Sequence, residues 1–233
     1  MTAERAIASI REQFSDPAFV ARYAEGPPRF VPGFADLHRL TALLLAERVP
    51  QDAHILVLGA GGGLEMKALA ALHPGWRFTG VDPAAAMLDL ARRTLGAQAS
   101  RAALIEGTID DAPEGPFDGA VCLLTLHFLD AAERRRTERE IHRRLKPGAP
   151  FVAAHASFPQ GEGARALWLS RYAAFALGGG ADPAQVETMR ANIEQALSLY
   201  EPQQDEDMLR AAGFRDVQMF YAAFTWRGWV AYA

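Results

Sequence analysis

The sequence predicts an α/β fold with a doubly wound, mainly parallel β-sheet, because strand and helix patterns alternate through the middle of the chain. Short apolar segments typical of buried strands fall near 54–58, 76–81, 102–106, 117–124 and 150–155. Helical patterns fall between them, near 63–72, 84–95 and 130–145. A glycine-rich turn follows the first strand, and an acidic residue ends the second. Ligands bind at the carboxyl ends of the strands in such sheets, so we expect a site there.

The start of the chain departs from this alternation. Residues 2–14 have a helical pattern, and Pro17 is placed to begin a second helix. The stretch 23–33 is rich in Pro and Gly and is expected to be a loop that closes over the site. Residues 35–49 have the periodicity of an amphipathic helix.

The end of the chain also differs. Residues 161–199 have a helical pattern that three glycines at 178–180 divide in two. A helix near 204–212 then precedes two strands over 214–224 and 226–232, which are expected to pair as a hairpin. We therefore expect a Rossmann-like sheet of seven strands, with a C-terminal antiparallel hairpin and a helical insert before the last two strands. The expected parts are the N-terminal helices and lid loop 1–49, the core 50–156, the insert 157–200, and the last helix with the closing hairpin 201–233.

Composition limits the class of protein. The chain has 233 residues, half of them hydrophobic, with a formal net charge of −4. This charge argues against direct nucleic-acid binding, which usually needs a basic face. The start of the chain has no apolar segment of signal-peptide length, and the apolar run 121–126 is too short to span a bilayer. No Cys and His cluster has metal-ligand spacing. We expect a cytoplasmic protein without membrane contact.

The glycine turn over 55–65 reads I-L-V-L-G-A-G-G-G-L-E. Gly59, Gly61 and Gly63 follow the spacing G-x-G-x-G, whereas a dinucleotide site needs G-x-G-x-x-G, and Leu64 stands at that last position. No Lys-Ser or Lys-Thr follows, which excludes a P-loop. The spacing fits S-adenosylmethionine (SAM), which has no pyrophosphate. A tight turn that binds no ligand is the alternative.

Asp82 lies 23 residues past Gly59, in F-T-G-V-D-P at the tip of the second strand. An acid at this place accepts both hydroxyls of a ribose. Together, the turn and the acid predict a nucleoside pocket.

The order of motifs resembles that of class I SAM-dependent methyltransferases. The motifs are I-L-V-L-G-A-G-G-G, G-V-D-P-A-A-A-M-L-D-L-A, I-E-G-T-I-D-D, F-D-G-A-V-C-L-L-T-L-H-F-L and E-I-H-R-R-L-K-P-G-A-P-F-V. The closing A-A-G-F-R-D-V with its hairpin is similar to the end of that family's fold. The resemblance implies SAM as cofactor and S-adenosyl-L-homocysteine as product. It places the following residues at the cofactor: Gly59, Ala60, Gly61, Gly63, Asp82, Pro83, Met87, Thr108, Ile109, Leu123 and Leu124.

The chain departs from that family at two positions. The acid usually found two residues before the first glycine is Val57 here. The acid that commonly holds the adenine amino group is Thr108, whose hydroxyl can still accept a hydrogen bond.

V-P-G-F, L-T-L-H-F-L and the two-helix insert resemble the carboxy-SAM synthase branch, whose members make a carboxylated SAM for tRNA modification. That branch relies on a Tyr, an Asn and an Arg, and the matching positions are Phe34, Leu123 and Met208. A thioether cannot replace the two-point grip of an arginine on a carboxylate. We therefore expect plain methyl transfer. Carboxy-SAM synthesis and a non-catalytic SAM-binding protein are the alternatives.

Methyl transfer by SN2 attack mainly needs alignment and a dry site, with a base only if the acceptor carries a proton that must leave first. His127, just after the fourth strand, is the expected base, and a structural histidine is the alternative. The histidines at 38, 54, 73 and 142 carry no recognisable pattern. If the aromatic stripe of the insert lines the cleft, it predicts a small apolar or aromatic acceptor; core packing and a homodimer contact are the alternatives. Residues expected near the acceptor are Tyr23, Arg29, His155, Trp168 and Tyr172.

Overall fold

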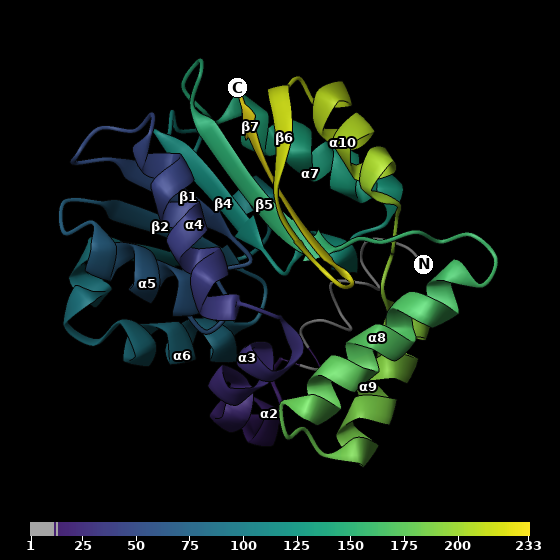
Figure 1. The fold of residues 1–233 in the computed structure, drawn as a ribbon. Helices are drawn as coiled ribbons and strands as arrows, with labels where there is room; N and C mark the ends of the chain where they lie inside the picture. The colour runs from purple at the N-terminus through teal and green to yellow at the C-terminus, as the bar shows by residue number, and fades with distance from the viewer. Residues whose placement is uncertain (1–11, 13) are drawn as a thin grey trace.

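The computed structural model describes residue 12 and residues 14–233, together with the side chains of all of these except 192 and 194–196. The helix expected over 2–14 therefore lies almost entirely outside the described residues. A seven-stranded sheet forms the centre of the molecule, with the strand order β3-β2-β1-β4-β5-β7-β6 (Figure 1). The strands are β1 (His54–Leu58), β2 (Arg77–Asp82), β3 (Ala102–Glu106), β4 (Gly119–Leu123), β5 (Pro150–Ala156), β6 (Arg215–Ala223) and β7 (Trp226–Tyr232).

Strands β1 to β5 are parallel, and β7 pairs antiparallel with both β5 and β6. Strand β1 is therefore central among the five parallel strands, with β2 and β3 on one side of it and β4 and β5 on the other. This is the point where the strand order reverses and where ligands bind in open α/β sheets. The predicted doubly wound sheet with its closing hairpin is confirmed.

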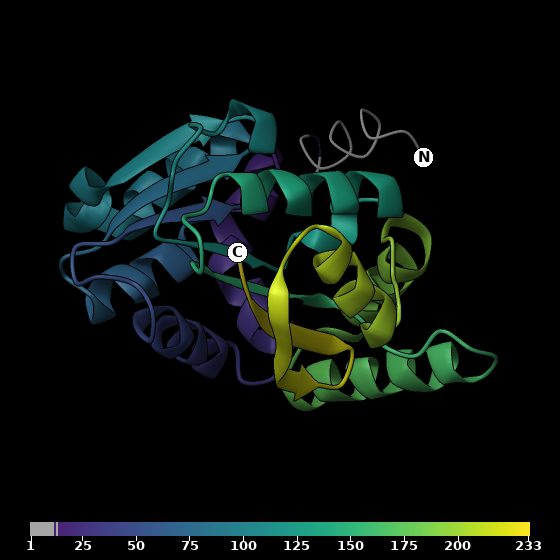
Figure 2. The same cartoon turned by 90° about the horizontal axis from the view of Figure 1, so that it is seen from above.

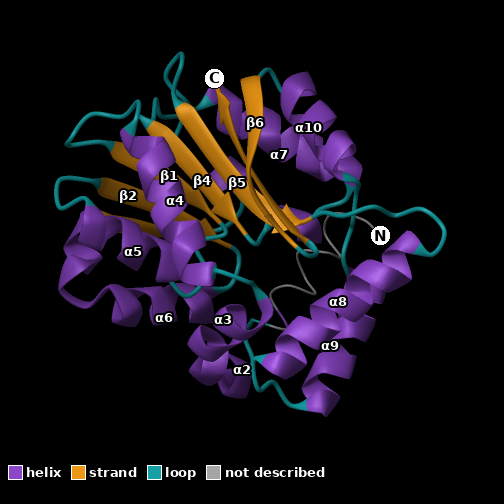
Figure 3. Cartoon of the chain, viewed as in Figure 1, coloured by secondary structure: helices purple, strands orange, loops and turns teal. Residues whose placement is uncertain are grey.

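Helices pack on both faces of the sheet (Figure 3). They are α2 (Pro17–Arg22), α3 (Gly26–Phe30), α4 (Phe34–Ala46), α5 (Leu64–Leu72), α6 (Ala85–Leu95), α7 (Ala131–Arg143), α8 (Ala164–Gly178), α9 (Pro183–Ala196) and α10 (Pro202–Ala211). Single turns of 3-10 helix are η1 (Tyr23–Glu25), η2 (Gly96–Arg101), η3 (Ile109–Asp111) and η4 (Leu126–Phe128). Among the described residues, no helix combines the length and the apolar composition needed to span a bilayer.

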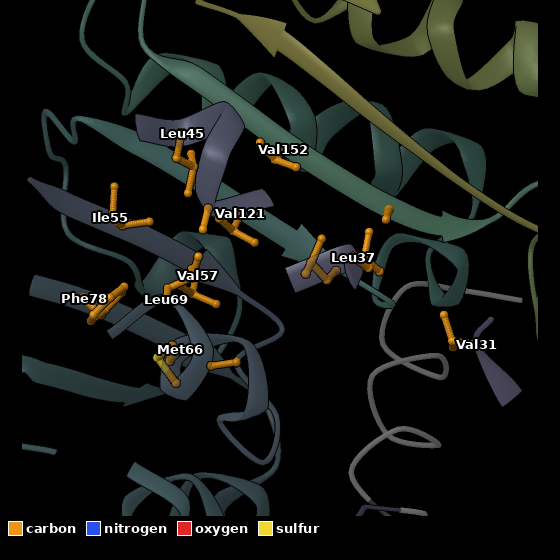
Figure 4. Packing of buried hydrophobic residues seen from close by; sticks show 14 of the residues in the cluster. Val31, Leu37, Leu45, Ile55, Val57, Met66, Leu69, Phe78, Val121 and Val152 are labelled. Atoms are coloured by element: carbon orange, nitrogen blue, oxygen red, sulfur yellow. The ribbon is translucent and has the colours of Figure 1, made fainter. Parts of the chain in front are cut away.

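The side chains of each strand alternate between the two faces, so each face has its own core. Ile55 and Val57 of β1 pack with Leu45 of α4 and Met66 of α5 (Figure 4). Leu56 belongs to the second core, on the face covered by α7 and α10. Burying each such side chain contributes about 1.5–3 kcal/mol. The carboxyl end of β1 is thus held firmly from both sides.

The expectation of a loop over 23–33 is wrong. The chain there forms the turn η1 and the short helix α3, before a left-handed Gly33 at which α4 begins. Pro27 and Pro28 are compatible with α3 because they lie in its first turn, where their missing N–H groups have no intrahelical partner. This helical segment lies beside the insert.

The insert forms two helices as expected, α8 and α9, which lie side by side. Asp182 begins α9, and its carboxylate accepts the N–H groups of Ala184 and Gln185. In Figures 1 and 2 the insert lies beside the tip of the β6–β7 hairpin. There the rings of Phe175 and Phe224 are 6.0 Å apart.

Candidate cofactor-binding site

The glycine turn forms a tight bend at the end of β1. Gly59 has a φ of +74°, and a Cβ atom there would lie 2.0 Å from Oγ1 of Thr125. The N–H groups of Gly59 and Ala60 both donate to the carbonyl of Val81, at 2.9 and 3.0 Å. The bend is therefore packed between β2 and the loop after β4, where no side chain would fit.

Asp82 ends β2 and reaches the bend directly. Its Oδ2 accepts the N–H of Gly61 at 2.8 Å, and its Oδ1 accepts the N–H of Ala84 at 2.9 Å. Burial raises the pKa of Asp82, and the hydrogen bonds from Ala84 and Gly61 oppose that shift. Each carboxylate oxygen has a second lone pair, so both can still accept the hydroxyls of a ribose. The structure thus brings together the two motifs from which the site was predicted.

A cavity of about 110 Å³ opens beside this contact, at the carboxyl ends of β1, β2 and β4. Helices α4, α5 and α7 and the N-terminal segment complete its wall. Its walls are mostly apolar. The lining residues are Phe14, Tyr23, Phe34, His38, Leu58, Gly59, Gly61, Leu64, Glu65, Val81, Asp82, Pro83, Gly107, Thr108, Ile109, Leu123, Leu124, Thr125, Phe128, Leu129, Glu133 and Thr137.

Most residues expected at the cofactor line this cavity. They are Gly59, Gly61, Asp82, Pro83, Thr108, Ile109, Leu123 and Leu124. Three others lie outside its lining. Ala60 is buried in the core, and Gly63 lies against Ala91 of α6. Met87 packs with Val20 and Tyr23.

Leu124 has a left-handed backbone, with a φ of +56°. A non-glycine residue in this region is strained, and such strain concentrates at binding sites. Its N–H donates to the carbonyl of Ala154 at 2.6 Å, which fixes the end of β4 against β5. Leu124 thereby lines the cavity instead of continuing the strand.

Tyr23 covers the glycine turn from the N-terminal segment. A Cβ atom on Gly62 would lie 2.7 Å from Cδ1 of Tyr23, and one on Gly61 would lie 3.2 Å from its hydroxyl. Burial raises the pKa of Tyr23, and the nearby carboxylates of Glu65 and Asp82 raise it further. Tyr23 thus forms part of the wall.

The other residues expected near the acceptor lie outside this lining. Arg29 is exposed and pairs with Glu25 at 3.3 Å. Trp168 faces Arg171 and Arg227.

Two further residues of this group are fully buried. Tyr172 stacks on Phe30, with the ring centres 6.0 Å apart. His155 is paired with Asp205, its Nε2 lying 3.2 Å from the carboxylate.

His127 is buried beside the cavity, with 4% of its surface exposed. Burial lowers the pKa of His127 well below its usual value, and His155 and Arg134 lower it further. Its Nδ1 accepts the N–H of Ala156 at 3.3 Å. A neutral imidazole in that arrangement carries its proton on Nε2, so neither nitrogen has a free lone pair to accept a proton.

Sequence reasoning missed several lining residues, of which His38 and Glu65 matter most chemically. Burial lowers the pKa of His38 to about 4, so its imidazole is neutral at neutral pH. Burial raises the pKa of Glu65 to about 8, and Asp82 raises it further. Glu65 lies two residues after Gly63, which was a usable signal. His38 has no comparable signal, because only the fold brings α4 to the cavity.

A second cluster of buried charges lies where α7, α10 and the end of β5 meet. The guanidinium of Arg134 is fully buried and forms an ion pair with Asp205. It also donates to the carbonyl oxygens of Leu126, at 3.1 Å, and Ser198, at 2.7 Å. This cluster ties the loop after β4 to the end of the insert and to α10.

Comparison with known proteins agrees with this geometry. Residues 55–148 match the family model of the methyltransferase domain. The fold is similar to a putative O-methyltransferase from Nostoc punctiforme (TM-score 0.66, 23% identity, 92% of this chain and 59% of that one). It is also similar to PigF solved with S-adenosylhomocysteine (TM-score 0.67, 20% identity, 95% of this chain and 61% of that one). The chain spans less than two thirds of each of these structures. These findings support an enzyme of the SAM-dependent methyltransferase kind, with SAM as its cofactor.

The curated relatives that it matches include carboxy-S-adenosyl-L-methionine synthases. The synthase of Chromohalobacter salexigens is 27% identical over 221 residues, which cover 93% of this chain and 82% of the relative. The synthase of Campylobacter lari is 25% identical over 224 residues, or 96% of both chains. The chain therefore resembles this branch over nearly its whole length.

Proposed function

We propose that the protein transfers the methyl group of SAM to a small apolar or aromatic acceptor. The observation that carries this proposal is the 2.8 Å contact of Asp82 with the glycine turn, beside a cavity with apolar walls. Phe34 and Phe128 contribute aromatic surface to these walls. SN2 transfer requires the acceptor to be aligned with the sulfonium and water to be excluded, which such walls favour.

Carboxy-SAM synthesis is the second candidate, because the curated relatives carry that name. A carboxylated cofactor needs a cationic partner for its additional carboxylate. Met208, at the position matched to that branch's arginine, is buried on α10 and does not line the cavity. None of the described residues that line the cavity is a lysine or an arginine. These features favour unmodified SAM.

Of the two histidines in or next to the cavity wall, His38 is the better placed to act as a base, because Nδ1 of His127 already accepts a hydrogen bond. His127, predicted from the sequence, is buried against the ring of Phe128 and does not line the cavity, whereas His38 does. Tyr23 and its neighbours act as a lid in this proposal, since the cavity is smaller than the few hundred Å³ typical of ligand sites. The insert either borders the acceptor or forms a homodimer contact. We place the enzyme in the cytoplasm, acting on a small molecule and not directly on nucleic acid.

Calorimetric titration with SAM tests the proposal. We expect the wild type to bind SAM and Asp82→Asn to bind it about 100-fold more weakly, because an amide cannot accept both ribose hydroxyls and both backbone N–H groups. A screen of small aromatic acceptors that follows formation of S-adenosylhomocysteine then tests turnover. Binding without turnover would favour a non-catalytic protein, and a wild type that does not bind SAM would refute the proposal.

A further inference from the structure

Glu65 lies in the first turn of α5, directly after the glycine turn. Its side chain lines the cavity together with Gly59, Gly61 and Asp82, and 8% of the residue is exposed. The carboxyl group accepts its own backbone N–H. Among the residues that the structure describes, no other hydrogen-bond donor and no cation pairs with it. Burial of a carboxyl group without such partners costs folding free energy, unless a ligand supplies the missing partner.

The electrostatic character of the cavity is anionic. Asp82, Glu65 and Glu133 contribute carboxyl groups to its lining, and His38 is uncharged at neutral pH. Glu133 is already paired with Arg136 at 2.6 Å. The charge of Asp82 and the acidity of Glu65 therefore remain without a cationic partner from the described part of the chain.

The position that usually holds an acid in this motif is Val57, which lies fully buried in the core between the sheet and α5. Val57 cannot bind a cation. Glu65 follows the same bend along the chain, in the first turn of α5, and lines the cavity with Gly59 and Gly61. The chain thus has a carboxyl group at the amino-acid end of the expected cofactor site, supplied by a different residue.

We propose that the Glu65 carboxylate binds the ammonium group of the methionine moiety of the cofactor. This inference rests on the proposed function, because it requires SAM in the cavity. It assigns the ribose to Asp82 and the amino-acid end to Glu65. When the ammonium docks, the carboxylic acid of Glu65 loses its proton to solvent, and a charge-assisted hydrogen bond forms between the two groups.

The surroundings of Glu65 explain why its carboxylic acid loses a proton when the ligand's ammonium group binds. The groups that face it are Tyr23 from the N-terminal segment, Asp82 from β2 and Cys122 from β4. None of them is a cation. Burial followed by the charge of Asp82 raises the pKa of Glu65 to about 8, so the free protein holds Glu65 mostly protonated at pH 7. An adjacent ammonium reverses this shift.

The same arrangement discriminates between cofactors. SAM carries a sulfonium, an ammonium and one carboxylate, so its net charge is positive. A carboxylated SAM has a second carboxylate and no net charge. Two carboxyl groups without a cationic partner favour the first ligand and repel the additional carboxylate of the second.

The test compares Glu65→Gln with the wild type in calorimetric titrations. S-adenosylhomocysteine and 5′-methylthioadenosine are the two ligands compared, because the second lacks the amino-acid end, and SAM is titrated as a third. We expect the variant to bind S-adenosylhomocysteine about 10- to 100-fold more weakly and 5′-methylthioadenosine with unchanged affinity. Glu47→Gln is the matched control, because Glu47 is exposed at the end of α4. It should bind both ligands as the wild type does.

Three outcomes would overturn the inference. Equal loss for both ligands would mean that Glu65 supports the nucleoside or the fold. Loss for SAM but not for S-adenosylhomocysteine would place Glu65 at the sulfonium. Unchanged affinity would exclude the contact. A wild type that binds none of these ligands would instead refute the proposed function.

Proton release gives a second readout that needs no variant. Titrating the wild type with S-adenosylhomocysteine at pH 7, in buffers of different ionisation enthalpy, should show release of roughly one proton. Affinity should rise from pH 6 to pH 8, as Glu65 ionises, and fall above pH 8, as the ligand's own α-amino group loses its proton. Binding without proton release would contradict the assignment even if Glu65→Gln failed to fold.

Discussion

Asp205 and Glu65 are two buried carboxylic acids with opposite surroundings. Asp205 is 1% exposed, forms an ion pair with Arg134, and lies near His155. Burial acts to raise the pKa of Asp205, but His155 and Arg134 outweigh it, so the pKa is lowered. Glu65 has no such partners among the described residues, and its pKa is raised to about 8.

This difference indicates that Asp205 stabilises the fold, whereas Glu65 is available to bind a ligand. Around Asp205 the chain balances the buried charge with its own cation, which joins three segments of the fold. In the cavity the chain leaves the acid without a cation. Functional sites are where such unbalanced groups concentrate. The comparison therefore predicts that loss of the cation in the first region lowers stability, whereas substitutions in the second region weaken ligand binding, and removal of its unpaired acid changes how stability depends on pH.

The largest effect on stability is expected from Arg134→Met. The change leaves Asp205 as a buried acid without its main cation and removes two hydrogen bonds to backbone carbonyls. We expect the free energy of unfolding to fall by about 3–5 kcal/mol in urea denaturation. Arg143→Met is the control, because its ion pairs are exposed and contribute about 0–1 kcal/mol. Similar losses of unfolding free energy in both variants would show that the buried ion pair contributes no more than the exposed ones.

A smaller effect, which depends on pH, is expected from Glu65→Gln. The pKa of Glu65 is raised from 4.5 to about 8 in the folded protein, so the folded state binds more protons than the unfolded state within this window. The stability of the wild type therefore falls as pH rises from about 5 to about 8, and the variant lacks this contribution. The free energy of unfolding of the variant, relative to that of the wild type, should therefore rise by a few kcal/mol from about pH 5 to about pH 8.

Unfolding of both proteins in urea at pH 5 and pH 8 measures that difference. Glu138, whose pKa is also raised to about 8 by burial, contributes equally to both proteins and cancels. A difference that stays constant with pH would show that Glu65 ionises as readily in the folded chain as in the unfolded one.

Gly59→Ala should affect binding more than folding. A Cβ atom at this φ of +74° would lie 2.0 Å from Thr125, so the bend must open. We expect at least about a 30-fold loss of SAM affinity in calorimetry, or about 2 kcal/mol. Gly148→Ala is the matched control, because Gly148 has a similar φ of +77° but open space around it. It should bind SAM normally, and equal losses would indicate a general effect of backbone strain.

The smallest effect is expected from His127→Asn. His127 is buried against the ring of Phe128 and its Nδ1 is occupied, so turnover should change by less than about threefold. His38→Asn changes a histidine that lines the cavity, and it should lower kcat more. A loss of about 100-fold or more in His127→Asn alone would restore His127 as the base.

Sequence patterns predicted the part of the fold in which strands and helices alternate. Strand and helix periodicity located the parallel strands, and the spacing from Gly59 to Asp82 predicted a contact that the structure shows at 2.8 Å. Chain order could not reveal which segments far apart in sequence complete the cavity wall. His38 and Tyr23 reach it from α4 and η1, and the helical form of 26–30 was hidden by its prolines. The insert was predicted as helical, but its side chains face α3 and the hairpin.

Native mass spectrometry of the wild type with equimolar SAM and carboxy-SAM tests the central claim most directly, because both ligands share the ribose and differ in net charge. An acidic cavity, with Asp82 and Glu65 in its wall and no cation among the described lining residues, predicts that the SAM complex predominates. A predominant carboxy-SAM complex, or no complex with either ligand, would contradict the account.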